Sequence, residues 1–240
     1  MKILAVDTSS RNCSVSIVEV DKNKNINVIA QGNNDDERTH SVKLMPMIDN
    51  MFKTSNLSLD NIDLLACCLG PGSFTGIRIG VGTVLAFKDS LNIPCIGISS
   101  LQALAYNIND NGIICSLIDA KNNNVYFGVF EKKNNIVTQL EEFSFKTIDE
   151  IIPILQKYNK IIFVGDGSTL YQNKIKSEVK YDNIIFADTA KNDANSVSIA
   201  ISAYSKYKNG ESGDTHVLSP LYLRKSQAER ALEEKNIKDI

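Results

Sequence analysis

Leu4-Ala5-Val6-Asp7-Thr8, close to the start of this 240-residue chain, has a counterpart in Leu117-Ile118-Asp119-Ala120. Each is an apolar run that reaches an acid and leads into a segment of alternating apolar and polar residues. A second pair follows in the same order, Leu69-Gly70-Pro71-Gly72-Ser73 and then Val164-Gly165-Asp166-Gly167-Ser168. Internal repetition of this kind predicts two copies of one folding unit.

The first copy reads as a meander of strands followed by alternating helices and strands. Period-two alternation and short turns predict antiparallel strands at 2–7, 13–20 and 26–31. Apolar residues at three- and four-residue steps and continuous apolar runs predict the elements that follow. These are helices at about 40–55, 75–91 and 99–107, with strands at 62–69 and 95–98. This order is typical of a ribonuclease-H-like unit, in which helical crossovers add parallel strands to the meander.

The second copy starts in the same way, at Ile113 to Asp119. The further elements predicted for it are strands at 125–130, 136–143 and 161–164 and helices at 147–158 and 195–208. The fold class is therefore α/β, with two tandem ribonuclease-H-like lobes of the kind shared by actin, Hsp70 and sugar kinases. We expect an N-terminal lobe over 1–108, a C-terminal lobe over 109–215, and a tail over 216–240 that returns to the first lobe.

Composition limits the partners and the compartment. The chain is 43% apolar and 22% charged with a net charge of −2, so no strong basic field exists to hold a nucleic acid unaided. The apolar run at the N-terminus is too short for a secretory signal, and no stretch approaches the length of a membrane helix. The five cysteines include no Cys-x-x-Cys pair. These observations predict a cytoplasmic protein with buried thiols and no membrane association.

Two-lobed folds of this class have a cleft, and a nucleotide is one candidate ligand for it. Backbone N–H groups in tight turns of small residues can bind phosphates. The candidate residues are Asp7, Thr8 and Ser9 in the first lobe and Gly165, Asp166, Gly167 and Ser168 in the second. The alternative is that the two aspartates only cap the turns after their strands. No P-loop lysine accompanies these turns.

Metal and nucleophilic chemistry find little support. The only histidines are His40 and His216, and no zinc-binding motif contains them. His40 lies at a predicted helix start, where a capping or packing role is favoured. Neither histidine lies in a sequence context that marks it as the base for a serine or cysteine nucleophile. We therefore predict no catalytic residue and no metal ligand, and a metallopeptidase is the least favoured function.

The densest signal is the run from Gly70 to Gly80. Gly72, Gly76 and Gly80 are spaced by four, and a glycine inside a helix costs about 1 kcal/mol relative to alanine. Repetition of that cost predicts the close approach of another helix or backbone. The candidates are the 40–55 helix of the same chain and a surface of another subunit. Three of the four methionines lie in the 40–55 helix, and methionine adapts to interfaces as well as to cores.

These motifs resemble the TsaB (YeaZ) family, subunits of bacterial tRNA threonylcarbamoyladenosine biosynthesis. The matching segments run through nearly the whole chain and are weakest over 130–215. They are Ile3-Leu4-Ala5-Val6-Asp7-Thr8-Ser9, His40-Ser41, Gly70-Pro71-Gly72-Ser73-Phe74-Thr75-Gly76-Ile77-Arg78, Ser99-Ser100-Leu101-Gln102-Ala103-Leu104-Ala105, Ile118-Asp119-Ala120-Lys121, Pro220-Leu221-Tyr222-Leu223-Arg224 and Ala228-Glu229.

The resemblance implies a subunit that is not an enzyme by itself. In the family, a metal-dependent catalytic paralogue, TsaD, and an ATPase, TsaE, act with it to modify N6 of adenosine 37 in tRNAs reading codons that start with A. The tRNA is then bound through the complex. No intrinsic cofactor is implied, and ATP or ADP at the interface of the complex is left open. The family is often called glycoprotease-like, but the residues here do not support peptidase chemistry.

The resemblance also places the partner on the first lobe, which agrees with the glycine spacing. The predicted interface residues are Leu44, Met45, Met47, Ile48, Met51, Ser73, Phe74, Thr75, Gly76, Arg78 and Gly80. On this interpretation, leucine at Gly76 or Gly80 abolishes pairing while the chain stays folded. An isolated chain is expected to form a homodimer through the same surface.

Two points stay open. Lys121 stands where many members have arginine, which weakens any charge-specific role at this position. The alternative function is an independent ATP-dependent phosphotransferase of the sugar-kinase type, with Asp7 as the general base at the end of the first strand.

Overall fold

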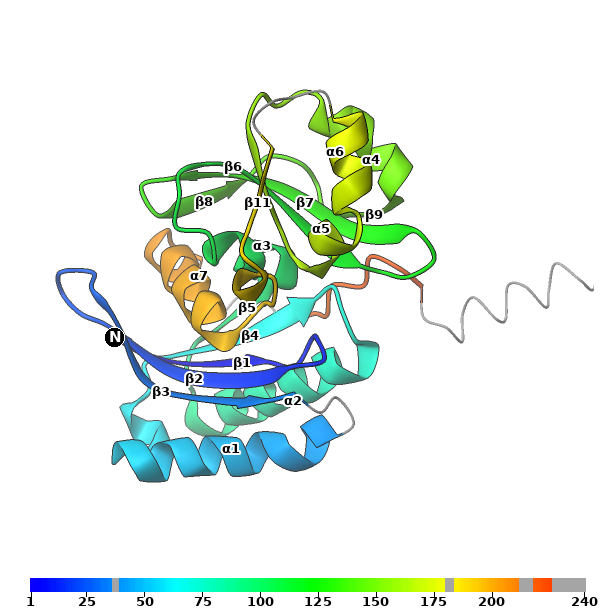
Figure 1. Ribbon diagram of the computed structural model, residues 1–240. Coiled ribbons are helices and arrows are strands. Elements are labelled where there is room, and N and C mark those ends of the chain that lie inside the picture. The colour runs from blue at the N-terminus through cyan, green and yellow to red at the C-terminus, as the bar shows by residue number, and fades with distance from the viewer. Residues whose placement is uncertain (36–38, 180–183, 212–217, 226–240) are drawn as a thin grey trace, which may run out of the picture.

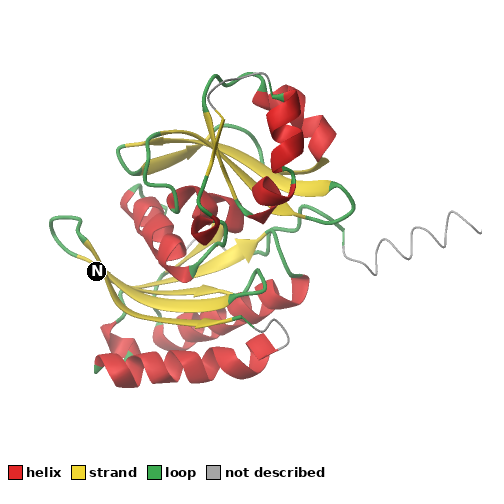
Figure 2. Ribbon diagram, viewed as in Figure 1, coloured by secondary structure: helices red, strands yellow, loops and turns green. Residues whose placement is uncertain are grey.

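A computed structural model describes residues 1–35, 39–179, 184–211 and 218–225 and shows two lobes, each built on one mixed sheet (Figures 1 and 2). His216, most of the predicted tail and the matching Ala228-Glu229 lie outside the described residues. No helix within those residues has the length and apolar character needed to cross a membrane.

The first lobe contains the meander and the crossovers that the sequence predicts. Its strands are β1 (Lys2–Asp7), β2 (Cys13–Val20), β3 (Ile26–Asn34), β4 (Leu64–Gly70) and β5 (Cys95–Ser99), in the sheet order β3-β2-β1-β4-β5. Its helices are α1 (His40–Ser55), the short 3-10 turn η2 (Leu59–Asn61), α2 (Phe74–Leu91) and α3 (Ser100–Tyr106). β1 pairs antiparallel with β2 and parallel with β4.

The second lobe repeats this pairing pattern. Its strands are β6 (Gly112–Asp119), β7 (Asn124–Lys133), β8 (Ile136–Gln139), β9 (Ser144–Thr147), β10 (Ile161–Val164) and β11 (Ile184–Phe186). β6 pairs antiparallel with β7 and parallel with β10, which pairs parallel with β11. β6 and β10 therefore correspond to β1 and β4, and the predicted two-copy fold is confirmed.

Helices cover both faces of the first sheet. Leu4, Val6, Val15 and Leu65 form one core with α1 and α2 on the outer face. On the inner face, α3 and α7 (Ser196–Lys208) form a core that also includes Phe130 and other side chains of the second sheet. The last layer is a third core, on the far face of the second sheet, with α4 (Ile148–Leu155) and α6 (Gln172–Glu178). The lobes thus share the core that lies between them.

Several details differ from the predicted elements. The strand expected at 136–143 ends at Gln139 as β8, and β9 is a separate strand that the sequence did not predict; both pair with β7. The helix expected at 147–158 ends at Leu155, and the sequence missed α5 (Asp166–Leu170), α6, η3 (Thr189–Lys191) and β11. α7 falls within the range predicted for the C-terminal lobe but packs on the first sheet. The missed segments are short or rich in Asn and Gln, so their hydrophobic periodicity was too weak to predict a helix or a strand.

Candidate functional site

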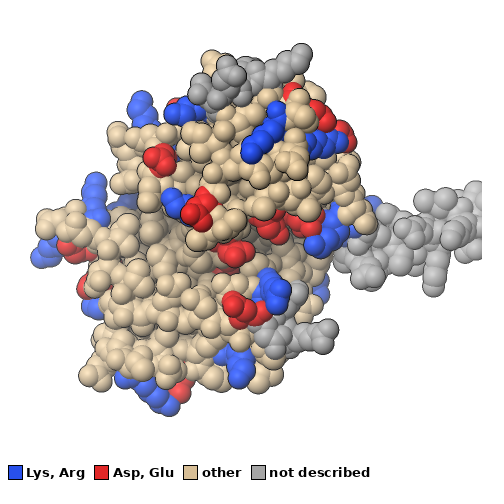
Figure 3. All heavy atoms as spheres, viewed as in Figure 1, with Lys and Arg blue, Asp and Glu red and all other residues tan. Residues whose placement is uncertain are grey.

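A cleft of about 450 Å³ lies between the lobes, and segments distant in the sequence line it. The first lobe contributes Ser9, Ser10 and Arg11 from the turn after β1, the Gly-rich segment 71–74, and Ser100. The second lobe contributes Asp119, Lys121, Asp166, Asn192 and Asp193, and the tail contributes Arg224 and Lys225. In the space-filling view, acidic side chains gather along this hollow (Figure 3).

The turn after β1 packs directly against α2. The Thr8 hydroxyl donates to the Gly76 carbonyl over 2.7 Å, and the Ser73 N–H donates to the Ser9 carbonyl over 2.7 Å. A Cβ at Gly76 would clash with the Thr8 carbonyl oxygen, and one at Gly80 with the Thr8 hydroxyl. The glycine spacing therefore serves an approach within the chain. The approaching segment is neither the 40–55 helix nor another subunit, so both predicted candidates were wrong for Gly76 and Gly80.

Asp7 ends β1 and has no exposed surface. Its Oδ1 accepts from the Ser9 N–H over 2.9 Å and from the Ser9 hydroxyl over 2.7 Å, while Oδ2 has no hydrogen-bond partner among the described residues. Burial raises the pKa of Asp7, although the bonds from Ser9 and the Cys68 thiol oppose that shift. Asp7 is thus a buried turn residue and does not line the cleft, which contradicts its predicted role as a general base for a substrate there.

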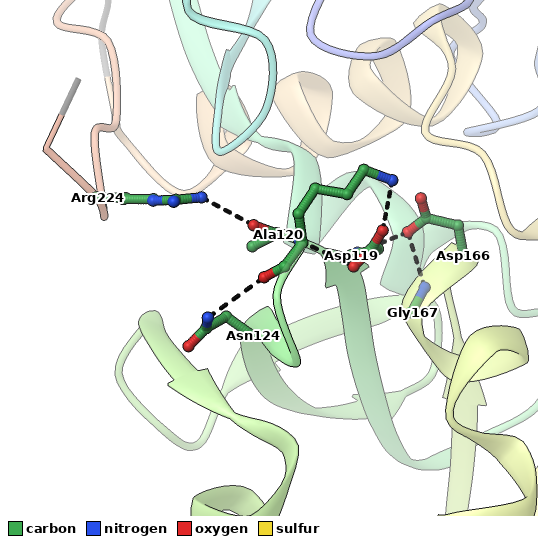
Figure 4. Close-up of polar contacts among 7 residues, drawn as sticks. Asp119, Ala120, Asn124, Asp166, Gly167 and Arg224 are labelled. Carbon is green, nitrogen blue, oxygen red and sulfur yellow. Dashed lines mark hydrogen bonds and ion pairs between the residues drawn. The ribbon is translucent and has the colours of Figure 1, made fainter. Parts of the chain in front are cut away.

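The equivalent turn of the second lobe borders the cleft (Figure 4). Asp166 Oδ1 accepts from the backbone N–H of Asp119 over 2.9 Å and from that of Gly167 over 2.7 Å. Burial raises the pKa of Asp166, and the nearby Asp119 charge adds to the shift. Asp119 in turn accepts from the Lys121 ammonium over 2.6 Å. The alternative role weighed for Asp166, the capping of a turn, is what the structure shows.

The remaining residues of the predicted nucleotide set mostly serve the fold. A Cβ at Gly165 would clash with the Leu117 carbonyl oxygen, and Gly165 has a φ of +101°. The Ser168 hydroxyl donates to the Gly165 carbonyl over 2.6 Å, and Ser168 is buried. Of this set, Ser9 and Asp166 line the cleft. Nucleotide binding there stays a prediction.

The tail connects the two lobes beside the cleft. The Leu221 N–H donates to the Leu69 carbonyl over 2.7 Å. The Tyr222 ring stacks on Phe74, with centroids 4.6 Å apart, and its hydroxyl accepts from Arg78 Nε over 2.8 Å. Arg224 donates to the Ala120 carbonyl over 2.8 Å, so it and Asp166 lie on opposite sides of the Asp119–Ala120 segment (Figure 4).

The predicted interface residues divide between core and surface. Leu44, Ile48 and Met51 are at most 3% exposed and belong to the first core, so their assignment to a surface was wrong. The glycines Gly76 and Gly80 are also buried. Met45, Thr75 and Arg78 are exposed, and Met47, Ser73 and Phe74 are half-buried. The α-helical period explains why buried and exposed residues alternate in this set. Each helix packs an apolar stripe against the sheet, and its other residues face solvent.

His40 and the five cysteines lie outside the cleft and are buried in the packing of the fold. His40 is 2% exposed and its Nε2 lies 3.0 Å from the Ser10 carbonyl, which confirms the packing role. All five cysteines are buried, and burial raises the pKa of Cys13 to about 11. Among the described residues, no three His, Cys, Asp or Glu side chains are grouped to hold a metal ion.

Sequence reasoning missed the contributions of Arg224 and Tyr222 to the cleft region, and it missed Gly82. The tail was visible as a motif, but its contacts join residues more than 100 positions apart in the sequence. Gly82 lies in the same predicted helix but does not fit the four-residue spacing of Gly72, Gly76 and Gly80, so no sequence pattern selected it. A Cβ at Gly82 would meet nothing within 4 Å, so no contact with the described residues explains this glycine.

Comparison with known proteins decides the family. The family model described as "TsaD: tRNA N6-adenosine threonylcarbamoyltransferase" matches residues 33–232. The chain is 34% identical to the TsaB protein of Buchnera aphidicola subsp. Schizaphis graminum over 185 residues, which cover 74% of this chain and 85% of that protein. This chain belongs to the TsaB family. It is also 29% identical to Bacillus subtilis TsaB over 231 residues, which cover 95% of this chain and 96% of that relative.

Solved structures agree on the fold of this TsaB family member. YeaZ from Pseudomonas aeruginosa superposes with a TM-score of 0.77 at 20% identity, covering 92% of this chain and 99% of that one. At this identity the likeness concerns the fold alone. It confirms the two-lobed α/β architecture that the sequence predicts.

Proposed function

We propose that this protein is a subunit for threonylcarbamoyladenosine biosynthesis in tRNA and that it acts without catalytic residues of its own. The observation that carries the proposal is the match to the Bacillus subtilis relative named for this pathway, which extends over 95% of the chain. Burial of Asp7 and of every cysteine also supports it, because the buried groups have no access to a substrate. A sugar-kinase-type phosphotransferase is not favoured. The cytoplasm, where tRNA is modified, is part of the same proposal.

The partner in this proposal is a TsaD-type catalytic paralogue, with a TsaE-type ATPase and tRNA joining the complex. The family model that matches the chain is itself described as a transferase of the TsaD type, so the paralogue has a related fold. ATP or ADP is then bound at the interface of the complex. No intrinsic cofactor is assigned to this chain.

We place the paralogue on the exposed faces of α1 and α2, which cover the outer face of the first sheet (Figure 1). On α1, Val42 is 68% exposed and Met45 is 48% exposed. On α2, Gly82 and Ala86 are exposed one turn apart. Gly82 costs α2 about 1 kcal/mol, and no contact within the described part of the chain requires a glycine there. A partner helix that approaches this face closely would explain why a glycine occupies position 82.

Reconstitution tests the function. The chain is mixed with the paralogue, the ATPase, tRNA and threonylcarbamoyl-adenylate, and modified adenosine is measured with and without it. We expect modification to depend on the chain. Full modification without it, or transfer by the chain alone, contradicts the proposed role.

Substitution at Gly82 tests the surface. Gly82→Leu is expected to reduce capture of the paralogue at least tenfold while thermal unfolding stays cooperative, because the site is open in the isolated chain. Gly82→Ala is the matched control, since it adds one methyl group and should retain most of the binding. Equal capture by both variants excludes α2 as the contact. This test replaces the predicted leucine substitutions at Gly76 and Gly80, which would unfold the first lobe.

A further inference from the structure

The described part of the tail, residues 218–225, runs from the first lobe to the second without forming a helix or a strand. Three kinds of contact fasten its start to the first lobe. Leu218 is 6% exposed and belongs to the core beneath α1 and α2. The Leu221 N–H donates to a carbonyl of β4, and the Tyr222 ring lies flat on Phe74 with an angle of 6° between the planes. The tail is therefore fixed firmly on the first lobe.

The contact of the tail with the second lobe is of a different kind. Leu223 packs against the core that the lobes share, and Arg224 then reaches the second lobe. Arg224 Nη1 donates to the Ala120 carbonyl over 2.8 Å, and the guanidinium lies 5.2 Å from the centroid of the Phe145 ring. Both partners are neutral, whereas a guanidinium binds charged oxygens more strongly. This end of the tail is held by a contact that can be exchanged.

The turn that receives Arg224 is strained. Residues 121–123 follow Ala120 with φ values of +65°, +54° and +62°, and none of them is a glycine. Residues in this left-handed region cost energy, and they persist only where the surrounding contacts hold them. The Ala120 N–H donates to the Asn124 carbonyl across the turn, and the Ala120 C=O accepts from Arg224 (Figure 4). Arg224 thus holds a turn that can relax when the bond is released.

The lobes are also joined at a second place, where the chain crosses between them after α3 and again before α7. Asn107 on the first crossing binds the second crossing. Its Nδ2 donates to the Lys191 and Asp193 carbonyls, both over 2.9 Å. Its Oδ1 accepts from Asn195 Nδ2 over 3.1 Å. In Figure 1, α7 and the red tail segment lie at opposite sides of the region between the lobes, so these two connections are well separated.

We propose that the tail is a latch on the cleft. Arg224 holds the second lobe against the first, and release of its bond to Ala120 lets the lobes part about the crossings joined by Asn107. Domain closure of this kind turns on a few residues at element ends, while the contacts at the mouth are broken and remade. Arg224 and Lys225 both line the cleft of about 450 Å³. A ligand larger than this volume can therefore enter only after the latch opens.

Pulsed electron double resonance between two nitroxide labels measures the opening. The labels are attached through Ser41→Cys on α1 and Ser177→Cys on α6, two exposed serines on the outer helices of the two lobes. The native cysteines are buried, so the folded protein is labelled at the introduced thiols. Dilution with unlabelled protein removes any signal between chains. In Arg224→Ala we expect the separation to increase by more than about 2 Å. Arg224→Lys keeps a cationic donor and should show a smaller increase.

Hydrogen exchange of single backbone amides locates the released contact. In Arg224→Ala, the amides of Ala120 and Asn124 in the strained turn are expected to exchange at least about tenfold faster than in wild type. The Leu221 amide should keep its protection, because its bond to β4 and the Tyr222 stack remain. Arg224→Gln takes the place of the alanine variant if thermal unfolding shows that the latter does not fold.

Arg11→Ala is the matched control. Arg11 also lines the cleft, but it donates to the Asp35 carbonyl of its own lobe over 3.3 Å. Its loss removes the same charge without cutting a bond between the lobes, so the label separation should stay at the wild-type value. The latch is refuted if the Arg224 variants leave the separation and the Ala120 amide unchanged. It is refuted equally if Arg11→Ala opens the lobes as far, or if Leu221 loses protection together with Ala120.

Discussion

The turns after β1 and β6 hold equivalent places in the two lobes, yet they differ in exposure. The Asp7 carboxylate is fully buried, and Asp7 Oδ2 is unpartnered. The Asp119 side chain keeps 9% of its surface exposed, lines the cleft and pairs with Lys121. The difference follows from the helix that each turn meets. Gly76 and Gly80 let the long α2 pack onto the first turn, whereas the second turn meets α5, which has only five residues. The two lobes therefore share a fold, but the turn after β1 is buried and the turn after β6 lines the cleft.

The largest effect is expected where α2 meets the first turn. Gly76→Ala places a methyl group against the Thr8 carbonyl oxygen, which belongs to the backbone and has little room to move. We expect a loss of about 3 kcal/mol or more in the free energy of unfolding. Gly82→Ala is the matched control on the same helix, where the space is open, and should gain up to about 1 kcal/mol. Urea unfolding of both variants measures the contrast, and equal stabilities would refute this account of the glycine spacing.

Next in size is the effect of pH on the buried aspartate. Burial raises the pKa of folded Asp7 above 3.8, its ordinary value, so the folded protein holds this proton more tightly than the unfolded chain. The contribution of Asp7 to stability therefore falls as pH rises from 3.8 through the raised pKa, by at most about 1.4 kcal/mol per pH unit. Asp7→Asn removes this slope.

The measurement is a difference between two proteins. Urea unfolding of wild type and Asp7→Asn from about pH 4 to pH 8 cancels the titration of all other groups in the subtraction. We expect wild type to lose stability relative to Asp7→Asn as pH rises. A difference that grows in favour of wild type would mean that the bonds from Ser9 outweigh burial.

The same contrast shows what the sequence could predict. The repeated strand-and-acid pattern around Asp7 and Asp119 was sufficient to predict the two lobes and most of their strands, but the short strands β9 and β11 were missed. The side-chain environments were not predictable, since they depend on which helix packs on each turn. The spacing of Gly76 and Gly80 predicted a close approach, but Thr8 lies 68 residues from Gly76 in the sequence. Gly82, which we propose to lie at the partner surface, lay outside the four-residue spacing, so no sequence pattern marked it.

A smaller effect is expected where the tail packs against α2 of the first lobe. Tyr222→Ala removes both the stack on Phe74 and the bond from Arg78, and should cost about 1 kcal/mol of unfolding free energy. Tyr222→Phe retains the stack and loses only the bond, so it should cost less than half as much. A double-mutant cycle with Phe74→Ala isolates the stacking energy. Additive costs of the two alanine substitutions would show that the rings do not interact.

The smallest effect concerns the turn after β6, where two weak contributions oppose each other at Lys121. Its ammonium pairs with Asp119, but the side chain is 80% exposed, and such pairs contribute about 0.5 kcal/mol or less. Its φ of 65° lies in the left-handed region, which costs a residue with a Cβ about 1 kcal/mol. Lys121→Ala loses the ion pair with Asp119 but keeps the left-handed backbone, so this variant should be slightly less stable than wild type. Lys121→Gly loses the same pair but relieves the backbone, so it should be more stable than Lys121→Ala by about 1 kcal/mol. Thermal and urea unfolding of the three proteins give the order, and an alanine variant at least as stable as the glycine variant would show that the left-handed turn carries no cost.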